Sequence, residues 1–378
     1  MGIMELGELR SQIDETDAAI AELYEKRMDI CSQVADCKIK TGKKVYDPER
    51  EEQKIASVGD LAHNEFNRKG LEELFEQIMS TSRKLQYSRM TAAGVQYALP
   101  FDEVDGLNRE NAKVVFQGAE GAYSQMAMLK YFGEGVSCFH VDTFRDAVDS
   151  ICTGKADYAV LPIENSTAGS VAQIYDLLAE YECYIAAEQI LQIQHCLMGL
   201  PGACISGLKT VYSHPQSLMQ SARYLNGHPG WKLISMQNNA FAAQKVRDDA
   251  DMTQAAIASE QAAKIYGLEV LEKGVNQEAR NETRFIIVTD KRIFRHDADK
   301  ISICFELPHR SGSLYRILSH FIYNDLNMTK IESRPLEGRN WEYRFFVDFT
   351  GNLKDSAVRN ALLGIREESS SMKILGCY

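Results

Sequence analysis

The stretch MELGELRSQIDETDAAIAELYEKRMDICSQVADCKIK, residues 4–40, decides the fold of the N-terminal part of the chain. Its apolar residues recur every three or four positions from Leu6 through Ile20 to Val34, which predicts an amphipathic helix. A helix of this length extends roughly 55 Å, more than the width of a globule built from about ninety residues. We therefore expect the helix to pack against a partner chain.

Three cations interrupt the apolar pattern of this helix, namely Arg10, Arg27 and Lys38. At about 100° per residue, Lys38 lies roughly 20° from Arg27 around the helix axis, whereas Arg10 lies roughly 100° away. Two of the cations therefore share a face, and the third does not.

Two shorter helices are predicted to complete a helical domain over residues 1–90. Asp47-Pro48 predicts the start of one helix, because Asp is a favourable N-cap and Pro suits the first helical position. The other is expected from about Asn64 to Arg89, with Ser82 and Gln86 one turn apart.

The polar residues of these helices resemble those of the all-helical chorismate mutases, a family of interlocked homodimers. The matching positions are Arg10, Arg27, Lys38, Asp47, Arg50, Glu51, Ser82 and Gln86. The resemblance implies that Arg27 and Arg10 of the partner subunit hold the two carboxylates of chorismate. It also implies that Lys38 and Gln86 bind the ether oxygen and that Glu51 binds the ring hydroxyl. The alternative is a dimeric coiled coil with solvated charges.

Composition limits the classes of function. A length of 378 residues implies two or three domains, and a net charge of −11 argues against nucleic acid or an anionic membrane as a partner. Nine cysteines without a C-x-x-C pair favour a reducing compartment over a disulfide framework. Without a signal peptide or a long apolar run, we expect a cytoplasmic protein.

Residues 91–111 lack a sustained period and are predicted to be a linker. In residues 112–291, short apolar strands alternate with helices, which predicts an α/β domain. The alternation restarts near residues 199–202, so we expect two lobes with a cleft between them, a common place for a small ligand.

Polar motifs stand where the predicted strands of this domain end: Pro162–Ser166, Ser213–Gln216 and Asn281–Phe285. Each alone is weak, since such residues often cap turns and helices. Together with Gly118–Ser124 and His195–Leu197, they resemble the prephenate dehydratase family. The chain departs from the family pattern at Gln117, Ala119 and Ala122.

The family's polar positions are matched by Glu164, Asn165, Ser213, His214, Gln220, Thr283 and Arg284. The resemblance implies loss of the ring hydroxyl and of carbon dioxide from prephenate, with neither a metal nor an organic cofactor. We expect Thr283 to be the donor at the leaving hydroxyl and Arg284 to anchor a carboxylate, with a surface salt bridge as the alternative for Arg284. His195 and His214 are expected to be structural.

Residues 298–378 are predicted to form the βαββαβ succession of a ferredoxin-like sandwich. Two of its segments, Gly312–Leu314 and Ile331–Pro335, resemble the ACT regulatory domain. The resemblance implies phenylalanine binding between paired domains, by Gly312, Ser313, Leu314, Glu332, Ser333 and Arg334. The alternative is a dimerisation module without a ligand.

The order of the three units resembles the bifunctional chorismate mutase/prephenate dehydratase family. The resemblance implies chorismate and prephenate as substrates, phenylalanine as a feedback inhibitor, and a homodimer, with a tetramer left open. Two other hypotheses are a non-catalytic amino-acid sensor that dimerises through the helical domain, and an enzyme whose mutase has decayed to a dimerisation element.

Overall fold

The computed structural model describes residues 5–95, 99–309, 311–336 and 338–378. The chain divides into two compact units, the first built from residues 1–99 and 305–372 and the second from residues 100–304 and 373–378. The division falls inside strands β14 (Lys300–Glu306) and β17 (Ser371–Cys377).

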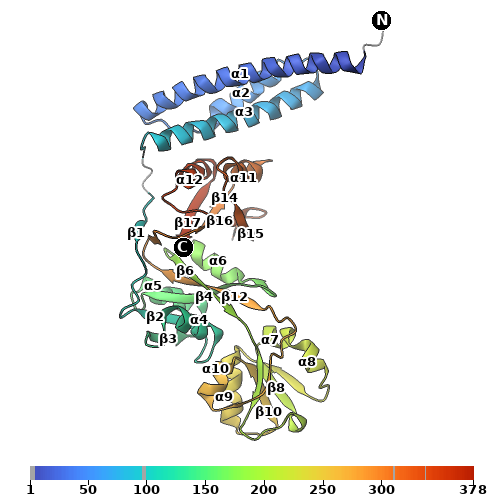
Figure 1. Cartoon of the computed structure of the whole chain (residues 1–378), viewed down its shortest axis with the longest axis vertical. Coiled ribbons are helices and arrows are strands. Elements are labelled where there is room, and N and C mark those ends of the chain that lie inside the picture. The colour runs from blue at the N-terminus through green and yellow to red at the C-terminus, as the bar shows by residue number, and fades with distance from the viewer. Residues whose placement is uncertain (1–4, 96–98, 310, 337) are drawn as a thin grey trace. The chain divides into compact units, whose positions relative to one another are not determined.

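Three helices form the N-terminal part of the first unit: α1 (Leu6–Thr41), α2 (Pro48–Gly59) and α3 (Glu65–Ala92) (Figure 1). The predicted long helix is confirmed; it has 36 residues, ends at Thr41 and is capped by Gly42, whose φ of 67° is left-handed. Met4, its predicted start, lies outside the described residues. Asp47 caps α2 as predicted, since its carboxylate accepts from the backbone N–H of Arg50 at 3.2 Å.

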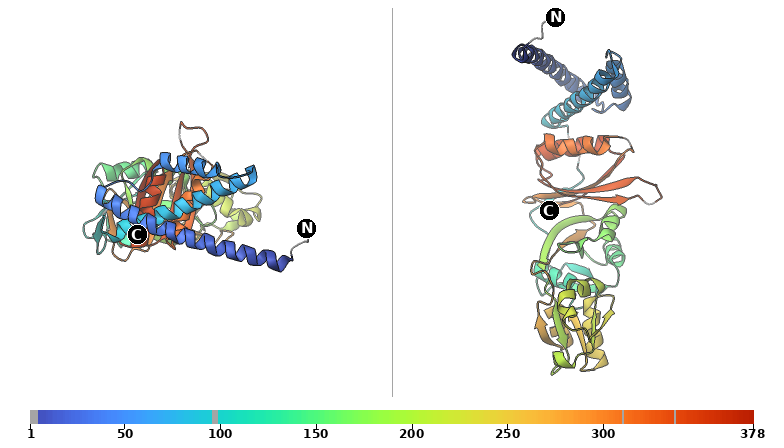
Figure 2. Two further views of the ribbon diagram at one scale, coloured as in Figure 1. Left: turned by 90° about the horizontal axis from the view of Figure 1, so that it is seen from above. Right: turned by 90° about the vertical axis from the view of Figure 1, so that its right-hand side faces the viewer.

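The apolar face of α1 is largely uncovered in the single chain. Leu6, Ile13 and Leu23 are 64%, 57% and 66% exposed, and within the described part of α1 the one fully buried residue is Ala35. Figure 2 shows the N-terminal half of α1 extending away from α2 and α3. An apolar stripe of this length in water agrees with the expected partner chain.

The first unit also contains α11 (Ser313–Tyr323), β15 (Met328–Pro335), β16 (Tyr343–Thr350) and α12 (Ser356–Glu368). Strands β15 and β16 pair antiparallel. With β14 and β17, the C-terminal residues follow the predicted order strand, helix, strand, strand, helix, strand. Helix α12 packs on α3, where Tyr87 and Leu363 share a small apolar core.

The second unit has two lobes, each built on one sheet. In the first lobe the strand order is β14-β17-β6-β12-β4-β2-β3. Its remaining elements are β2 (Lys113–Gln117), α4 (Tyr123–Phe132), β3 (Ser137–Val141), α5 (Phe144–Cys152), β4 (Tyr158–Asn165), β5 (Gly169–Ser170), α6 (Ala172–Glu180), β6 (Tyr184–Gln192) and β12 (Glu282–Thr289).

In the second lobe the strand order is β11-β7-β10-β8-β9. The elements are β7 (Cys196–Gly199), a short 3-10 helix (Ile205–Gly207), β8 (Thr210–Ser213), α7 (Pro215–Gln220), α8 (Ala222–Asn226), β9 (Lys232–Ser235), α9 (Asn239–Asp249), β10 (Gln254–Ala258), α10 (Glu260–Tyr266) and β11 (Glu269–Lys273). Two crossings, residues 193–195 and 274–281, connect the lobes, so polar residues on them lie where the lobes meet.

The predicted linker is partly structured. Helix α3 continues to Ala92, residues 96–98 lie outside the described residues, and β1 (Asp102–Val104) pairs in parallel with β13 (Ile293–Arg295). A strand of three residues carries no sequence period, and its partner is almost 200 positions away in the chain. The local pattern therefore could not show it.

Candidate active sites

A cavity of about 470 Å³ lies among the three N-terminal helices. Seven of the eight residues predicted for this domain line it: Arg27, Lys38, Asp47, Arg50, Glu51, Ser82 and Gln86. The eighth, Arg10, lies on the exposed N-terminal part of α1 and does not line the cavity. The structure thus brings together residues from three helices that the sequence analysis grouped by family resemblance.

The polar side chains of this cavity are held by the helices that carry them. Arg27 donates to the hydroxyl of Ser82, which itself donates to the carbonyl of Ile78 at 2.7 Å. Lys38 donates to the carbonyl of Val45 at 2.7 Å, which ties α1 to the start of α2. Burial lowers the pKa of Lys38, and the nearby carboxylates of Glu367, Asp47 and Glu51 partly offset that effect.

Arg83 also lines this cavity and was not predicted from the sequence. Its side chain is 4% exposed and bonds two carboxylates, Glu51 at 2.5 Å and Glu368 at 2.8 Å. A cation one position after Ser82 was visible in the sequence. Its partner Glu368 lies 285 positions away, which no helical period can reveal.

In the second unit, Asn165 on β4 and Thr283 on β12 are directly paired across antiparallel strands. The amide Oδ1 of Asn165 accepts from the backbone N–H groups of Thr167 and Ala168 at 3.0 and 2.9 Å. This fixes the amide orientation, so Nδ2 donates to Thr283 Oγ1 at 2.9 Å and to Asn281 Oδ1 at 2.7 Å.

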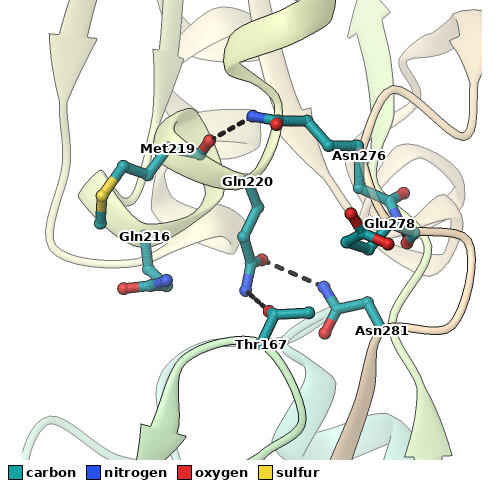
Figure 3. A pocket seen from close by; sticks show the side chains of 8 residues that line it. Thr167, Gln216, Met219, Gln220, Asn276, Glu278 and Asn281 are labelled. Atoms are coloured by element: carbon teal, nitrogen blue, oxygen red, sulfur yellow. Dashed lines mark hydrogen bonds between the residues drawn. The ribbon is translucent and has the colours of Figure 1, made fainter.

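Gln220, the last residue of α7 in the other lobe, joins this group. Its Nε2 donates to Thr167 Oγ1 at 2.8 Å, and its Oε1 accepts from Asn281 Nδ2 at 3.2 Å (Figure 3). Because Gln220 Nε2 also donates to the fixed Oδ1 of Asn165 at 3.3 Å, the orientation of Gln220 is determined as well. The network therefore spans both lobes.

His195 is 1% exposed, and the hydrogen-bond partners of its ring show which nitrogen carries the proton. Its Nε2 lies 2.9 Å from Gln220 Oε1, an acceptor, so Nε2 carries the hydrogen. Its Nδ1 lies 2.8 Å from the hydroxyl of Tyr123, which donates to the carbonyl of Gln194 at 3.0 Å. Burial lowers the pKa of His195, which favours this neutral form and agrees with the predicted structural role.

A cavity of about 220 Å³ opens beside Gln220. Its lining comes from α7 and from residues 276–281, and Thr167 and Asn281 lie next to Gln220 at its edge (Figure 3). Of these residues, Gln220 was predicted as a matching family position, and Gln216 and Asn281 belong to the polar motifs of the sequence. Thr167 and Asn276 were missed, although Thr167 follows the polar motif that ends at Ser166.

Ser213 ends β8 and His214 is the N-cap of α7, and neither lines this cavity. Ser213 is fully buried, with its hydroxyl 2.6 Å from the carbonyl of Ile257. His214 caps α7, because its Nδ1 accepts from the backbone N–H of Gln216 at 3.2 Å. These contacts shape the lobe, and the roles predicted for both residues stay predictions.

Arg284 and Glu164 lie on the opposite face of the sheet from Thr283 and Asn165. Neighbouring residues of a strand point to opposite faces, and the register pairs Arg284 with Glu164 one step after Thr283 with Asn165. Arg284 lies 3.5 Å from the Glu164 carboxylate and 3.4 Å from that of Glu188. The side chains of Asn165, Gln220, Asn281 and Thr283 form one hydrogen-bonded group, here called the Thr283 cluster. The predicted anion anchor, Arg284, lies on the other face of the sheet from this cluster.

The predicted effector residues lie in the first unit. Gly312, with φ 75°, precedes α11, and Ser313 and Leu314 line a cavity of about 380 Å³. Glu332, Ser333 and Arg334 lie on β15, and Ser333 pairs with Phe345, which also lines that cavity. The structure thus places the two predicted segments on elements that meet through β16, although Glu332 to Arg334 do not line the cavity themselves.

Within the described part of the chain, no helix combines the length and apolar character needed to span a bilayer. The same residues contain no cluster of three His, Cys, Asp or Glu side chains placed to bind a metal ion.

Comparison with known proteins covers nearly the whole chain. Residues 9–87 match the family "chorismate mutase type II" and residues 114–293 match "prephenate dehydratase". The prephenate dehydratase of Arthrobacter aurescens, solved in complex with L-Phe, is 28% identical with a TM-score of 0.66, over 70% of this chain and 89% of that one. A structure described as a quorum quenching acylase, GqqA, is 30% identical with a TM-score of 0.63, over 70% and 97%.

Among full-length relatives, the bifunctional chorismate mutase/prephenate dehydratase of Escherichia coli K12 is 31% identical over 98% of this chain and 95% of its own length. That of Enterobacter agglomerans is 32% identical over the same shares. Both halves of this domain pair occur here in the same order. Seven predicted polar residues line the cavity of the helical domain, and Gln220 lines the cavity of the second unit. The chain therefore belongs to the bifunctional chorismate mutase/prephenate dehydratase family.

Proposed function

We propose that the cavity around Lys38 is the chorismate mutase site and that the Thr283 cluster with the cavity beside Gln220 is the prephenate dehydratase site. The first reaction gives prephenate, and the second converts prephenate to phenylpyruvate, water and carbon dioxide in the synthesis of phenylalanine. The observation that carries the proposal is the convergence of seven predicted residues from three helices on one cavity of about 470 Å³.

The mutase reaction is pericyclic and needs no proton transfer. It requires that chorismate be held in a reactive conformation and that donors face the ether oxygen, where negative charge develops. Lys38 and Gln86 supply such donors, and Arg27 binds a carboxylate. Glu51 accepts from the ring hydroxyl.

This site is completed by a second copy of the chain. Arg10 stands on the exposed half of α1, whose apolar face needs a partner. In a homodimer that covers this face, Arg10 of the partner subunit binds the second carboxylate. A tetramer would pair two such dimers.

In the dehydratase reaction, aromatisation of the ring drives the loss of water and carbon dioxide. The enzyme positions the ring and assists departure of the hydroxyl. Thr283 Oγ1 accepts from Asn165, so its own hydrogen is directed toward another acceptor. We assign that acceptor as the departing oxygen of prephenate, with Asn165 and Gln220 fixing the geometry.

We further propose that residues 298–378 form an ACT domain that binds phenylalanine and inhibits the dehydratase. The βαββαβ succession and the left-handed Gly312 before α11 support this role. The A. aurescens relative crystallised with L-Phe points to the same ligand. In this proposal the helical mutase domain spans residues 1–90, a linker spans residues 91–111 and the dehydratase domain spans residues 112–291. We expect the enzyme in the cytoplasm.

The test is an assay that starts from chorismate and follows prephenate and phenylpyruvate separately, with and without phenylalanine. We expect both products, with less phenylpyruvate when phenylalanine is present. Binding of phenylalanine without turnover of either substrate would favour the non-catalytic sensor instead.

A further inference from the structure

Arg83 connects the mutase cavity to the C-terminal residues of the first unit. It extends from α3, and its side chain is 4% exposed. Its NH1 donates to Glu51 Oε2 at 2.5 Å, and its Nε donates to Glu368 Oε1 at 2.8 Å. The same cation thus bonds one carboxylate that lines the cavity and one that does not.

Glu368 is the last residue of α12, and its side chain is also 4% exposed. Its Oε1 lies 3.0 Å from Nε2 of His320, a residue of α11 that is 1% exposed. Burial alone would raise the pKa of Glu368, but His320 and the charge of Arg83 outweigh burial and lower it. The carboxylate is therefore charged at neutral pH and matched to Arg83.

The geometry of the guanidinium sets the position of Glu51. An arginine offers its donors in a rigid, planar fork, so the direction of one bond fixes the direction of the other. With Nε held by Glu368, NH1 holds Oε2 of Glu51 and leaves Oε1 for a ligand in the cavity. A buried charge that loses one partner is costly, so the arrangement resists rearrangement.

We propose that Arg83 and Glu368 are positioning residues for the mutase reaction, acting through Glu51. Arg83 aims the Glu51 carboxylate at the substrate, and Glu368 aims Arg83. The mutase site therefore depends on the final turn of α12, in a region that neither the mutase match nor the dehydratase match covers. This inference rests on the proposed role of Glu51 toward the ring hydroxyl.

The test is a double-mutant cycle on the full-length chain, with mutase kcat and KM measured on chorismate. Bonds to charged groups are worth about 1.5–3 kcal/mol, so Glu368→Gln and Arg83→Lys should each lower kcat about ten- to a hundredfold. Dehydratase activity on supplied prephenate should stay within about twofold of the parent, as a check on folding. Arg366→Gln, an exposed change on the same helix, should leave both activities unchanged.

In a Glu51→Gln background, Glu368→Gln should cost nothing further, because Glu368 acts only through Glu51. Fully additive losses would overturn the proposal by giving Glu368 a separate structural role. The proposal would also be overturned if Glu51→Gln lowers mutase kcat and Glu368→Gln leaves it unchanged. The proposed function would stand in that case. If Glu51→Gln itself has no effect while Arg27→Ala abolishes turnover, the role of Glu51 fails and the positioning proposal fails with it. Glu368→Gln, the milder change, decides the matter if Arg83→Lys does not fold.

Discussion

Asn165 and Thr283 face each other across strands β4 and β12, and the Asn165 amide donates to the Thr283 hydroxyl at 2.9 Å. Two backbone N–H groups hold the opposite end of that amide. The Thr283 oxygen is thus an acceptor from Asn165, and its hydrogen is available to a substrate. This pairing makes Thr283 the best candidate for the donor in the dehydratase reaction.

Replacing this hydroxyl should stop dehydration selectively. One preorganised donor is worth roughly 3–4 kcal/mol, so Thr283→Val should lower dehydratase kcat by about a hundredfold or more. Valine keeps the shape of threonine, so the KM for prephenate and the mutase activity should change little. Steady-state assays on prephenate and chorismate measure both effects.

The matched control is Thr283→Ser, which keeps the hydroxyl but frees its rotamer and should retain substantial activity. If valine works nearly as well as threonine, the hydroxyl is structural. The donor would then be sought at Ser213, His214 or Glu164.

A second prediction concerns the shared mutase site. Arg10→Ala and Arg27→Ala homodimers should both be inactive, whereas a mixture under exchange conditions should regain activity, because each heterodimer keeps one complete site. Native mass spectrometry of differently tagged chains verifies that heterodimers form. Heterodimers without recovered activity would assign Arg10 to its own subunit's site or to the surface.

A third prediction addresses the effector segments. Gly312 has φ 75°, a conformation that a β-branched residue adopts only with strain, so Gly312→Val should weaken phenylalanine binding. Ser333→Ala should weaken it as well, and both variants should keep their basal dehydratase activity. Isothermal titration calorimetry with phenylalanine reports the affinity. Absence of binding to the parent chain would reduce this region to a dimerisation module.

A fourth prediction concerns acid stability. The folded-state pKa of Glu368 lies below its ordinary value of 4.5. Its contribution to stability is therefore fully present above that value and is lost as the pH falls through the folded-state pKa. Glu368→Gln should lower the urea concentration at the midpoint of unfolding at pH 7. Between pH 5 and pH 3, the midpoint of this variant should fall less than that of the parent. A pH dependence identical to that of the parent would contradict the lowered pKa, with Arg366→Gln as the control.

Local signals predicted the elements well. The 3.6-residue period predicted α1, and Asp47-Pro48 predicted the start of α2. Both signals depend only on residues that are close together in the sequence. Thr283 and Arg284 are adjacent on one strand, so their opposite orientation could also be predicted from the sequence, and the anchoring role of Arg284 stays a prediction.

Other features could not be predicted from local pattern. The bond between Arg83 and Glu368 joins α3 to a helix that begins more than 260 positions later in the chain. The orientation of Gln220 follows from backbone donors in the other lobe. Both depend on tertiary contacts, which a single sequence does not encode in any period or motif.

The central claim is that one chain carries two independent active sites. The most direct measurement compares both activities of Arg27→Ala with those of the parent. Removing a cation that binds a substrate carboxylate should lower mutase turnover by at least about a thousandfold. Dehydratase turnover on supplied prephenate should remain nearly intact, because its residues lie in the other unit. Equal loss of both activities in a folded protein would contradict the account and indicate a single shared site.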